Sequence, residues 1–225
     1  LTENVFNFLP NYNCSNFIFF SSCKVYGEPS FNNSIFNETS KPSPQSDYAK
    51  AKLKTENMII KNSKINGVNF LIYRLPFVYG LGMKSNLSKI LSLIDRSLPF
   101  FMPVNPNLKK SFLYKGTINK VIEHNISNPY SINNEILNLA DNNPITLGEF
   151  IIKYKELNKS KSTIYLIPNY IFNFFKRVPL IRKLFAKVYG SFEIDNKKIK
   201  MINKVDIIST YNGIVNFSEK KNTWI

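Results

Sequence analysis

The sequence predicts an α/β protein with a parallel sheet, and three observations support that prediction. Two short apolar runs, Asn16–Phe20 and Val68–Tyr73, are typical of strands buried on both faces of a sheet. A stretch rich in Ala, Lys, Leu and Glu lies between them, over about 48–63, with the composition and spacing of a helix. Strands that alternate with helices are characteristic of parallel sheets covered by helices.

Capping and turn residues mark the limits of the predicted helix over 48–63. Ser46 or Asp47 can cap its N-terminus, because a short polar side chain accepts a hydrogen bond from the free N–H groups of the first turn. Asn66-Gly67 then turns the chain toward the second strand. The polar loop over 28–47 is longer than most connections, and loops of that length are usually functional or disordered.

The alternation continues through the rest of the chain. Thr146 can cap a helix over 147–157, with Glu149 at the capping-box position. The other expected elements are the end of a helix over 1–13, helices over 86–97 and 117–125, and strands over 111–114 and 135–139.

The net charge of +15 is concentrated late in the chain, since residues 151–225 carry 15 basic and five acidic side chains. Such charge suits nucleic acid, an anionic membrane or a phosphorylated substrate. No zinc spacing or nucleic-acid motif accompanies it, so no nucleic-acid partner is expected. No stretch approaches the ~20 apolar residues of a membrane span. We therefore attribute the charge mostly to a compositional bias.

Cysteine and histidine are scarce. Cys14 and Cys23 are too few for a disulfide framework and fit a reducing cytoplasm, with both expected to be small buried side chains. The single histidine, His124, has no partner in any motif, so no metal site is expected.

Polar residues follow both predicted strands at their carboxyl ends, where ligands bind in open α/β sheets. Ser22 follows the first strand and Arg74 begins the loop after the second. Tyr48 and Lys52 stand four residues apart and would share a helix face. An ammonium beside a phenol favours the phenolate, so such a tyrosine can exchange a proton with a substrate hydroxyl. With 12 tyrosines and 30 basic residues in the chain, this pair alone also arises by chance.

Three motifs, taken in order, resemble the extended short-chain dehydrogenase/reductase family, in its nucleotide-sugar epimerase/dehydratase group. They are Ser21-Ser-Cys-Lys-Val-Tyr-Gly27, Pro42-x-Pro-Gln-Ser-Asp-Tyr48-x-x-x-Lys52 and Arg74-Leu-Pro-Phe-Val-Tyr-Gly80. The resemblance implies the C-terminal part of a Rossmann-like parallel sheet with a smaller, mixed α/β substrate-binding domain. Residues 1–80 would form the second half of the NAD-binding domain and 81–225 mainly the substrate domain, with about 109–140 returning to the first.

The resemblance also implies roles for individual residues. Tyr48 would be the acid/base at the sugar 4-hydroxyl, and Ser22 would hydrogen-bond the same oxygen. Lys52 would favour the phenolate and bind the nicotinamide ribose of NAD or NADP. The remaining binding residues would be Leu75 and Pro76 near the nicotinamide, and Asn86 and Lys110 at the nucleotide diphosphate.

Three departures from the family pattern affect binding. The family begins with a glycine-rich turn that holds the cofactor pyrophosphate, and no such cluster occurs among the eight glycines. About three βα units of ~30 residues each are therefore expected to be lacking, in a fragment of an enzyme or in a truncated product. Lys110 stands where the family more often has Arg, which keeps the charge but loses the bidentate fork. Phe77 stands where epimerases often have a polar Asn.

The residues after Ser22 favour one branch of the chemistry. Dehydratases of this group follow the catalytic hydroxyl with Asp-Glu, whereas this chain has Cys23-Lys24, so dehydration is not expected. UDP-hexose 4-epimerisation in surface-polysaccharide synthesis is favoured slightly, and reduction of a 4-keto-sugar nucleotide is the alternative.

A non-catalytic, sugar-nucleotide-binding or membrane-peripheral remnant is the alternative of another class. It is motivated by the missing turn and by Tyr170–Lys187, an aromatic and basic stretch that could lie on an anionic bilayer. In the resemblance this stretch is helical and covers core and substrate, so membrane contact is not expected. We expect a cytoplasmic enzyme that forms a homodimer through the Tyr48–Lys52 helix.

Overall fold

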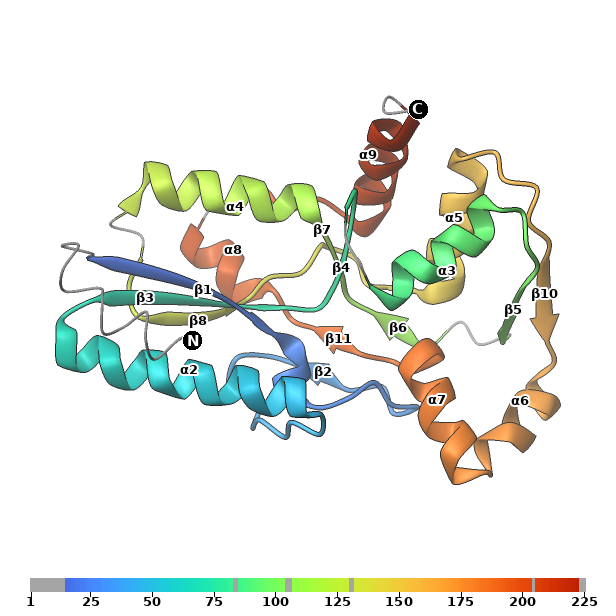
Figure 1. Cartoon of the computed structure of the whole chain (residues 1–225), viewed down its shortest axis with the longest axis horizontal. Coiled ribbons are helices and arrows are strands. Elements are labelled where there is room, and N and C mark those ends of the chain that lie inside the picture. The colour runs from blue at the N-terminus through green and yellow to red at the C-terminus, as the bar shows by residue number, and fades with distance from the viewer. Residues whose placement is uncertain (1–14, 83–84, 104–106, 130–131, 204, 223–225) are drawn as a thin grey trace.

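The computed structural model describes residues 15–82, 85–103, 107–129, 132–203 and 205–222. The helix end expected over 1–13 and Cys14 therefore lie outside the described residues. A parallel three-stranded sheet with the order β1-β3-β8 forms one half of the molecule (Figure 1). Its strands are β1 (Asn16–Ser22), β3 (Asn69–Leu75) and β8 (Glu135–Asn138). The predicted α/β class with a parallel sheet is confirmed.

Helices cover both faces of this sheet (Figure 1). Helix α2 (Asp47–Asn66) lies on one face, and α4 (Lys115–Ser127) with α8 (Lys197–Asn203) on the other. The alternating side chains of β3 explain this arrangement: Phe70 and Ile72 pack toward α2, whereas Leu71 and Tyr73 pack toward α4. A strand with apolar side chains on both sides is stable only between two such layers.

The strand β1 is less buried than predicted. Residues 16–20 are only half-buried, and within the described chain β1 pairs with β3 alone. The expectation of a strand buried on both faces is therefore correct for β3 and wrong for β1. An edge strand has one unpaired side, and that position leaves its apolar side chains partly open.

Smaller paired strands and a helical layer form the other half of the molecule (Figure 1). The strand pairs are β4-β7, β5-β10 and β2-β11, all parallel, and the antiparallel β6-β9. The strand bounds are β2 Ile35–Phe36, β4 Phe77–Tyr79, β5 Phe100–Pro103, β6 Lys109–Lys110, β7 Phe112–Tyr114, β9 Ile145–Thr146, β10 Ile164–Ile167 and β11 Glu193–Ile194. The other helices are the 3-10 turn η2 Cys23–Tyr26, and α3 Asn86–Asp95, α5 Leu147–Leu157, α6 Asn169–Lys176, α7 Pro179–Tyr189 and α9 Thr210–Asn222.

The core of this half is aromatic. Tyr79 packs edge-on against Phe150 with ring centroids 4.9 Å apart, and Phe112 and Phe217 complete the cluster. Edge-to-face packing of buried rings adds to the free energy of area burial. The described residues contain no helix with the length and apolar content needed to cross a membrane.

The predicted caps and turn are present. Ser46 caps α2, accepting a hydrogen bond from the Ala49 N–H, and Gly67 ends the helix in the left-handed region at φ 64°. Thr146 and Glu149 form the predicted capping box of α5. The loop over 28–47 contains β2 and is tied to the sheet where the Asn138 N–H donates to the Glu38 carboxylate at 2.8 Å.

Candidate active site

The carboxyl ends of β1 and β3 lie side by side and open onto one cavity. Ser22 and Leu75 are register partners in the parallel pair, so the two strands end at the same level. A cavity of about 250 Å³ begins there. Five of the seven predicted site residues line it: Ser22, Tyr48, Leu75, Pro76 and Asn86. They come from β1, α2, β3 and its following residue, and α3, which are far apart in the sequence.

Ser22 caps the turn η2. Its hydroxyl oxygen accepts a hydrogen bond from the Lys24 N–H at 3.2 Å, and the residue is buried. That bond uses a lone pair and leaves the hydroxyl hydrogen available to a ligand in the cavity.

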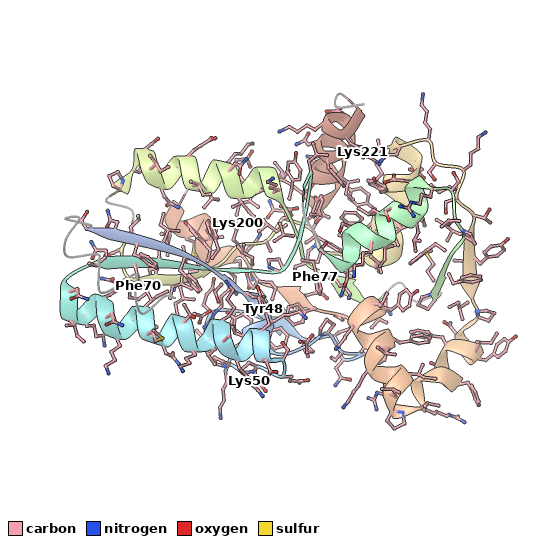
Figure 2. The ribbon with its side chains drawn as sticks, viewed as in Figure 1. Tyr48, Lys50, Phe70, Phe77, Lys200 and Lys221 are labelled. Atoms are coloured by element: carbon pink, nitrogen blue, oxygen red, sulfur yellow. The ribbon has the colours of Figure 1, made fainter. Side chains whose placement is uncertain are left out.

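Tyr48 lies in the first turn of α2 and is 55% exposed, although it also lines the cavity. Figure 2 shows it on the side of α2 that faces the sheet ends, whereas Lys50 points outward. The phenol is therefore accessible from solvent and from the cavity, as a group that exchanges protons with a ligand must be.

Lys52 is held next to Tyr48 by the strand β1. Its ammonium donates to the Phe20 carbonyl at 2.8 Å and lies 5.9 Å from the centroid of the Tyr48 ring. Burial lowers the pKa of Lys52, and the nearby Glu56 carboxylate partly offsets that effect. The cation thus stands on the Tyr48 side of α2, as the four-residue spacing predicts.

A buried ionic network lies next to this pair, one helical turn further along α2, and it was not predicted from the sequence. Glu56 follows Lys52 by one helical turn and binds Arg74 of β3 through two parallel bonds, Nη2–Oε2 at 2.6 Å and Nε–Oε1 at 3.1 Å. The Ser21 hydroxyl donates to the same carboxylate, and the Arg74 guanidinium lies over the Tyr26 ring at 4.8 Å. All of these side chains are buried. The available signal was that Tyr48, Lys52 and Glu56 repeat every four residues along one helix face.

Lys110 lines a second cavity, of about 100 Å³, that shares Lys24, Phe77 and Asn86 with the first. The Lys110 ammonium donates to the Lys187 carbonyl at 2.9 Å and lies 4.8 Å from the Phe77 ring centroid. Its residue is 3% exposed, and among the described residues no carboxylate forms an ion pair with it. Burial lowers the pKa of Lys110 to about 7, with a smaller contribution from the Lys24 charge and an opposing one from Glu28.

The burial of Lys110 predicts that the stability of the fold depends on pH. The folded state holds Lys110 at a pKa of about 7, below the usual 10.5, so folding releases its proton between these values and stability rises with pH there. Lys110→Met removes that dependence. We expect its melting temperature to exceed that of the unmodified chain most at pH 6, with the difference shrinking toward pH 10. Calorimetry across this range checks it.

The control for this prediction is Lys109→Met at the exposed neighbouring position. This variant is expected to show a difference from the unmodified chain that does not change with pH. A Lys110→Met difference that is equally flat would contradict the burial of a titrating ammonium.

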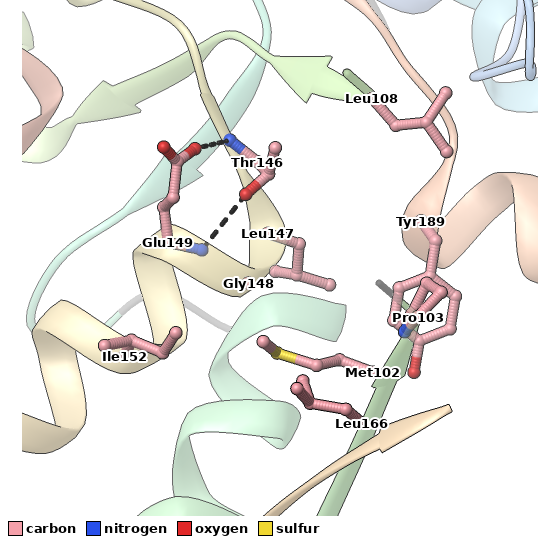
Figure 3. Close-up of a pocket in the computed structure, with 10 residues that line it drawn as sticks. All are labelled: Met102, Pro103, Leu108, Thr146, Leu147, Gly148, Glu149, Ile152, Leu166 and Tyr189. Atoms are coloured by element: carbon pink, nitrogen blue, oxygen red, sulfur yellow. Dashed lines mark hydrogen bonds between the residues drawn. The ribbon is translucent and has the colours of Figure 1, made fainter. Parts of the chain in front are cut away.

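A third cavity, of about 280 Å³, lies beyond the second and shares Leu147 with it (Figure 3). Most of its lining is apolar, from Met102, Leu108, Ile152 and Leu166. Its polar groups are already engaged: Glu149 and Thr146 bond to each other's N–H groups, and the Tyr189 hydroxyl donates to the Phe101 carbonyl at 2.6 Å. This pocket offers shape and apolar surface rather than acid–base groups, and the sequence did not predict it.

The described residues contain no group of three or more His, Cys, Asp or Glu side chains placed to hold a metal ion. Cys23 is a free, buried thiol, as expected, and its Sγ donates to the Arg74 carbonyl at 3.2 Å. Burial raises the pKa of this thiol, and the Arg74 charge opposes the rise.

The fold and the position of the cavities define a class. A parallel sheet with helices on both faces and a cavity at the carboxyl ends of its strands is the Rossmann-like arrangement. The NAD dependent epimerase/dehydratase family matches residues 1–106. The matched stretch contains all three motifs that carry the resemblance, and the family is the one that those motifs predicted.

Individual relatives agree with the match. The chain is 26% identical to a UDP-glucose 4-epimerase of Vibrio cholerae over 196 residues, which are 86% of this chain and 56% of that protein. The chain therefore spans little more than half the length of this curated relative.

Solved structures share the fold over the whole chain. A UDP-glucuronic acid 4-epimerase from Bacillus cereus in complex with NAD superposes with a TM-score of 0.76 at 15% identity, covering 99% of this chain and 66% of that one. A UDP-glucose 4-epimerase from Thermotoga maritima gives 0.74 at 19%, covering 100% and 69%. A dTDP-glucose 4,6-dehydratase from Bacillus anthracis gives 0.74 at 15%, covering 99% and 68%. Because epimerases and a dehydratase superpose equally well, the fold alone does not select the reaction.

Proposed function

We propose that this chain supplies the acid–base and substrate-binding groups of an NAD-dependent enzyme that inverts C4 of a UDP-hexose. The observation that carries the proposal is the single cavity lined by Ser22, Tyr48, Leu75, Pro76 and Asn86. It joins a proton-exchanging phenol, a hydroxyl donor and an apolar wall at the carboxyl ends of two parallel strands. Ligands of open α/β sheets bind at this level.

The residues present fit a nicotinamide cofactor. Leu75 and Pro76 offer an apolar surface beside Tyr48 in the cavity, and the Lys52 ammonium lies 5.9 Å from the centroid of the Tyr48 ring. In the proposal, these side chains hold the nicotinamide and its ribose. NAD, when bound, accepts the hydride from C4 and returns it to the opposite face of the sugar.

The proton is handled by this chain. Tyr48, as phenolate, takes the proton of the 4-hydroxyl while the hydride leaves, and gives it back when the hydride returns. The Lys52 ammonium lies 5.9 Å from the centroid of the Tyr48 ring. Ser22 donates to the same oxygen and holds it while the carbonyl exists. The charge that develops on that oxygen is therefore balanced by groups that are already in position.

The rest of the substrate would occupy the two further cavities. Asn86 and Lys110 would bind the diphosphate, whose negative charge offsets the cost of burying the Lys110 ammonium. The apolar pocket beyond Leu147 would take the nucleoside.

The residues after Ser22 support epimerisation over dehydration. Removal of water needs acid–base groups beside Ser22, but the Cys23 thiol is fully buried with a raised pKa, and Lys24 is paired with Glu28 at 3.1 Å. The Vibrio cholerae relative also favours 4-epimerisation. Reduction of a 4-keto-sugar nucleotide uses the same residues and is the second candidate.

The natural protein that contains this chain should be incubated with UDP-glucose and catalytic NAD, and the sugar followed by proton NMR. We expect UDP-galactose to form without net consumption of cofactor. Stoichiometric oxidation of a reduced nicotinamide with a UDP-4-keto sugar would instead identify the reductase. No conversion of any UDP-hexose or UDP-4-keto-hexose would overturn the proposal.

Two further proposals concern assembly and location. We propose a homodimer through α2, whose outer face carries a shallow hollow lined by Leu53, Met58 and Lys54. Sedimentation velocity of Met58→Glu tests it: an unchanged dimer would contradict this interface.

We propose a cytoplasmic location, supported by the free Cys23 thiol, and cell fractionation tests it.

A further inference from the structure

The helices α6 and α7 form a corner at the edge of the molecule (Figure 1). Their inner side is packed. Phe172 is fully buried and stacks on Phe185 with centroids 5.5 Å apart, and Tyr189 packs edge-on against both rings. Phe31 contacts Phe172 from the loop before β2 at 5.7 Å. These contacts attach the two helices to each other and to the rest of the chain.

Both helices also carry exposed apolar side chains. Tyr170 and Phe174 lie four residues apart on α6 and are 75% and 64% exposed. Leu180 and Leu184 are spaced in the same way on α7 and are 71% and 56% exposed, and α7 has no buried residue at all. Residues four apart share a helix face. Scattered exposed apolar residues need no explanation, but an exposed apolar row on each of two adjoining helices is more than scatter.

The expectation that this stretch covers the core therefore holds for its inner side only. The stretch combines an aromatic seam that folds it with apolar side chains that stay exposed. The exposed apolar side chains would be stabilised by contact with another surface.

The charge around this face has one sign. From 157 to 192 the sequence has seven Lys or Arg residues and no Asp or Glu. Arg182, Lys183 and Lys187 on α7 are exposed, as is Arg177 in the turn between the two helices. Elsewhere the chain mixes both signs, as in the pairs Lys50–Asp47 and Lys198–Glu135.

We propose that the outer face of α6 and α7, defined by Tyr170, Phe174, Leu180 and Leu184, binds the surface of an anionic lipid bilayer. Helices with exposed aromatic and aliphatic side chains beside Arg and Lys lie in the interface plane, with the apolar face among the acyl chains and the cations at the headgroups. A second copy of this chain is a poor occupant, because a two-fold contact would bring the same basic side chains together. This contact is peripheral and does not depend on the proposed catalytic function.

The test is co-sedimentation of the chain with vesicles of phosphatidylcholine alone, or of phosphatidylcholine mixed with phosphatidylglycerol. We expect binding to the anionic vesicles only, weakening as salt is raised, because screening shortens the reach of the charges. Leu180→Glu with Leu184→Glu should lower the partition coefficient at least about tenfold, since two apolar contacts are replaced by two anions.

Matched controls distinguish binding through this face from non-specific hydrophobic adsorption and from an effect of net charge alone. Ile126→Glu on α4 replaces another side chain that is well exposed, and it should leave binding unchanged. Arg182→Glu with Lys183→Glu should abolish binding, whereas Lys64→Glu on α2 with Lys120→Glu on α4 makes the same change in net charge and should lower it less. All of these side chains are exposed, so melting temperatures verify that each variant is folded.

Three outcomes would overturn the proposal. The first is no binding to anionic vesicles at low salt. The second is an equal loss of binding in the α7 variants and in their controls. The third is a change of oligomeric state in Leu180→Glu with Leu184→Glu while vesicle binding persists, which would identify the face as a protein interface.

Discussion

Tyr48→Phe is expected to lower turnover by a factor of about 10²–10⁴, the usual contribution of a positioned acid–base group. The phenol lines the cavity with Ser22, and its ring stands 5.9 Å from the Lys52 ammonium. Phenylalanine keeps the ring but cannot accept or return the proton of the sugar hydroxyl. Turnover with UDP-glucose, measured in the natural protein that contains this chain, checks the prediction.

Tyr48→Phe should leave substrate affinity and the stability of the fold unchanged, because the Tyr48 side chain is half-exposed and the substitution removes no core contact. Tyr211→Phe on α9 is the matched control, since it removes another exposed phenolic hydroxyl outside the cavity lining. If the turnover of Tyr48→Phe were close to that of Tyr211→Phe, the assignment of Tyr48 as the acid–base group would be wrong.

Glu56→Leu is expected to destabilise the fold by about 3–5 kcal/mol, because it leaves the Arg74 guanidinium buried without its carboxylate. Burial alone lowers the pKa of Arg74, but the hydrogen bonds to Glu56, the Tyr26 phenol and the charge of Glu56 together more than offset this and raise it. The same carboxylate accepts the Ser21 hydroxyl, so one substitution breaks several bonds between α2, β1 and β3. Urea unfolding measures the loss.

The double variant Glu56→Leu with Arg74→Met should be less destabilised than Glu56→Leu, because it removes the unpaired charge as well as the pair. The surface pair Lys153–Glu156, at 4.0 Å, is the control, and its removal should cost at most about 0.5 kcal/mol. A Glu56→Leu loss no larger than that of the control would contradict a network that holds α2 to the sheet.

Local features of the fold could be predicted from the sequence because their causes are local. Ser46, Gly67 and the Thr146–Glu149 box act on neighbouring N–H groups, and the structure has each of them as expected. The spacing of Tyr48 and Lys52 fixes their common face for the same reason. The helix expected over 86–97 ends earlier, at Asp95, and the strand over 111–114 is interrupted at Ser111, since such limits depend on what packs against them.

The parts that could not be predicted depend on distant residues. Glu56 and Arg74 are 18 positions apart and meet only when α2 packs on β3. Lys109 and Lys110 are neighbours in the sequence, yet Lys109 is exposed, whereas Lys110 is buried against the Phe77 ring and the Lys187 carbonyl. Phe77, which departs from the family pattern, thus supplies the aromatic face that this cation needs. The exposure of β1 likewise follows from which strands lie beside it.

The fate of the C4 hydrogen tests the central claim most directly. UDP-glucose labelled with deuterium at C4 should be converted by the natural protein that contains this chain, and the product examined by NMR. If Tyr48 moves the hydroxyl proton while the C4 hydrogen travels as hydride to a bound cofactor and back, deuterium stays at C4 of an inverted UDP-galactose. Loss of the label to solvent, or no inversion at C4, would contradict the account.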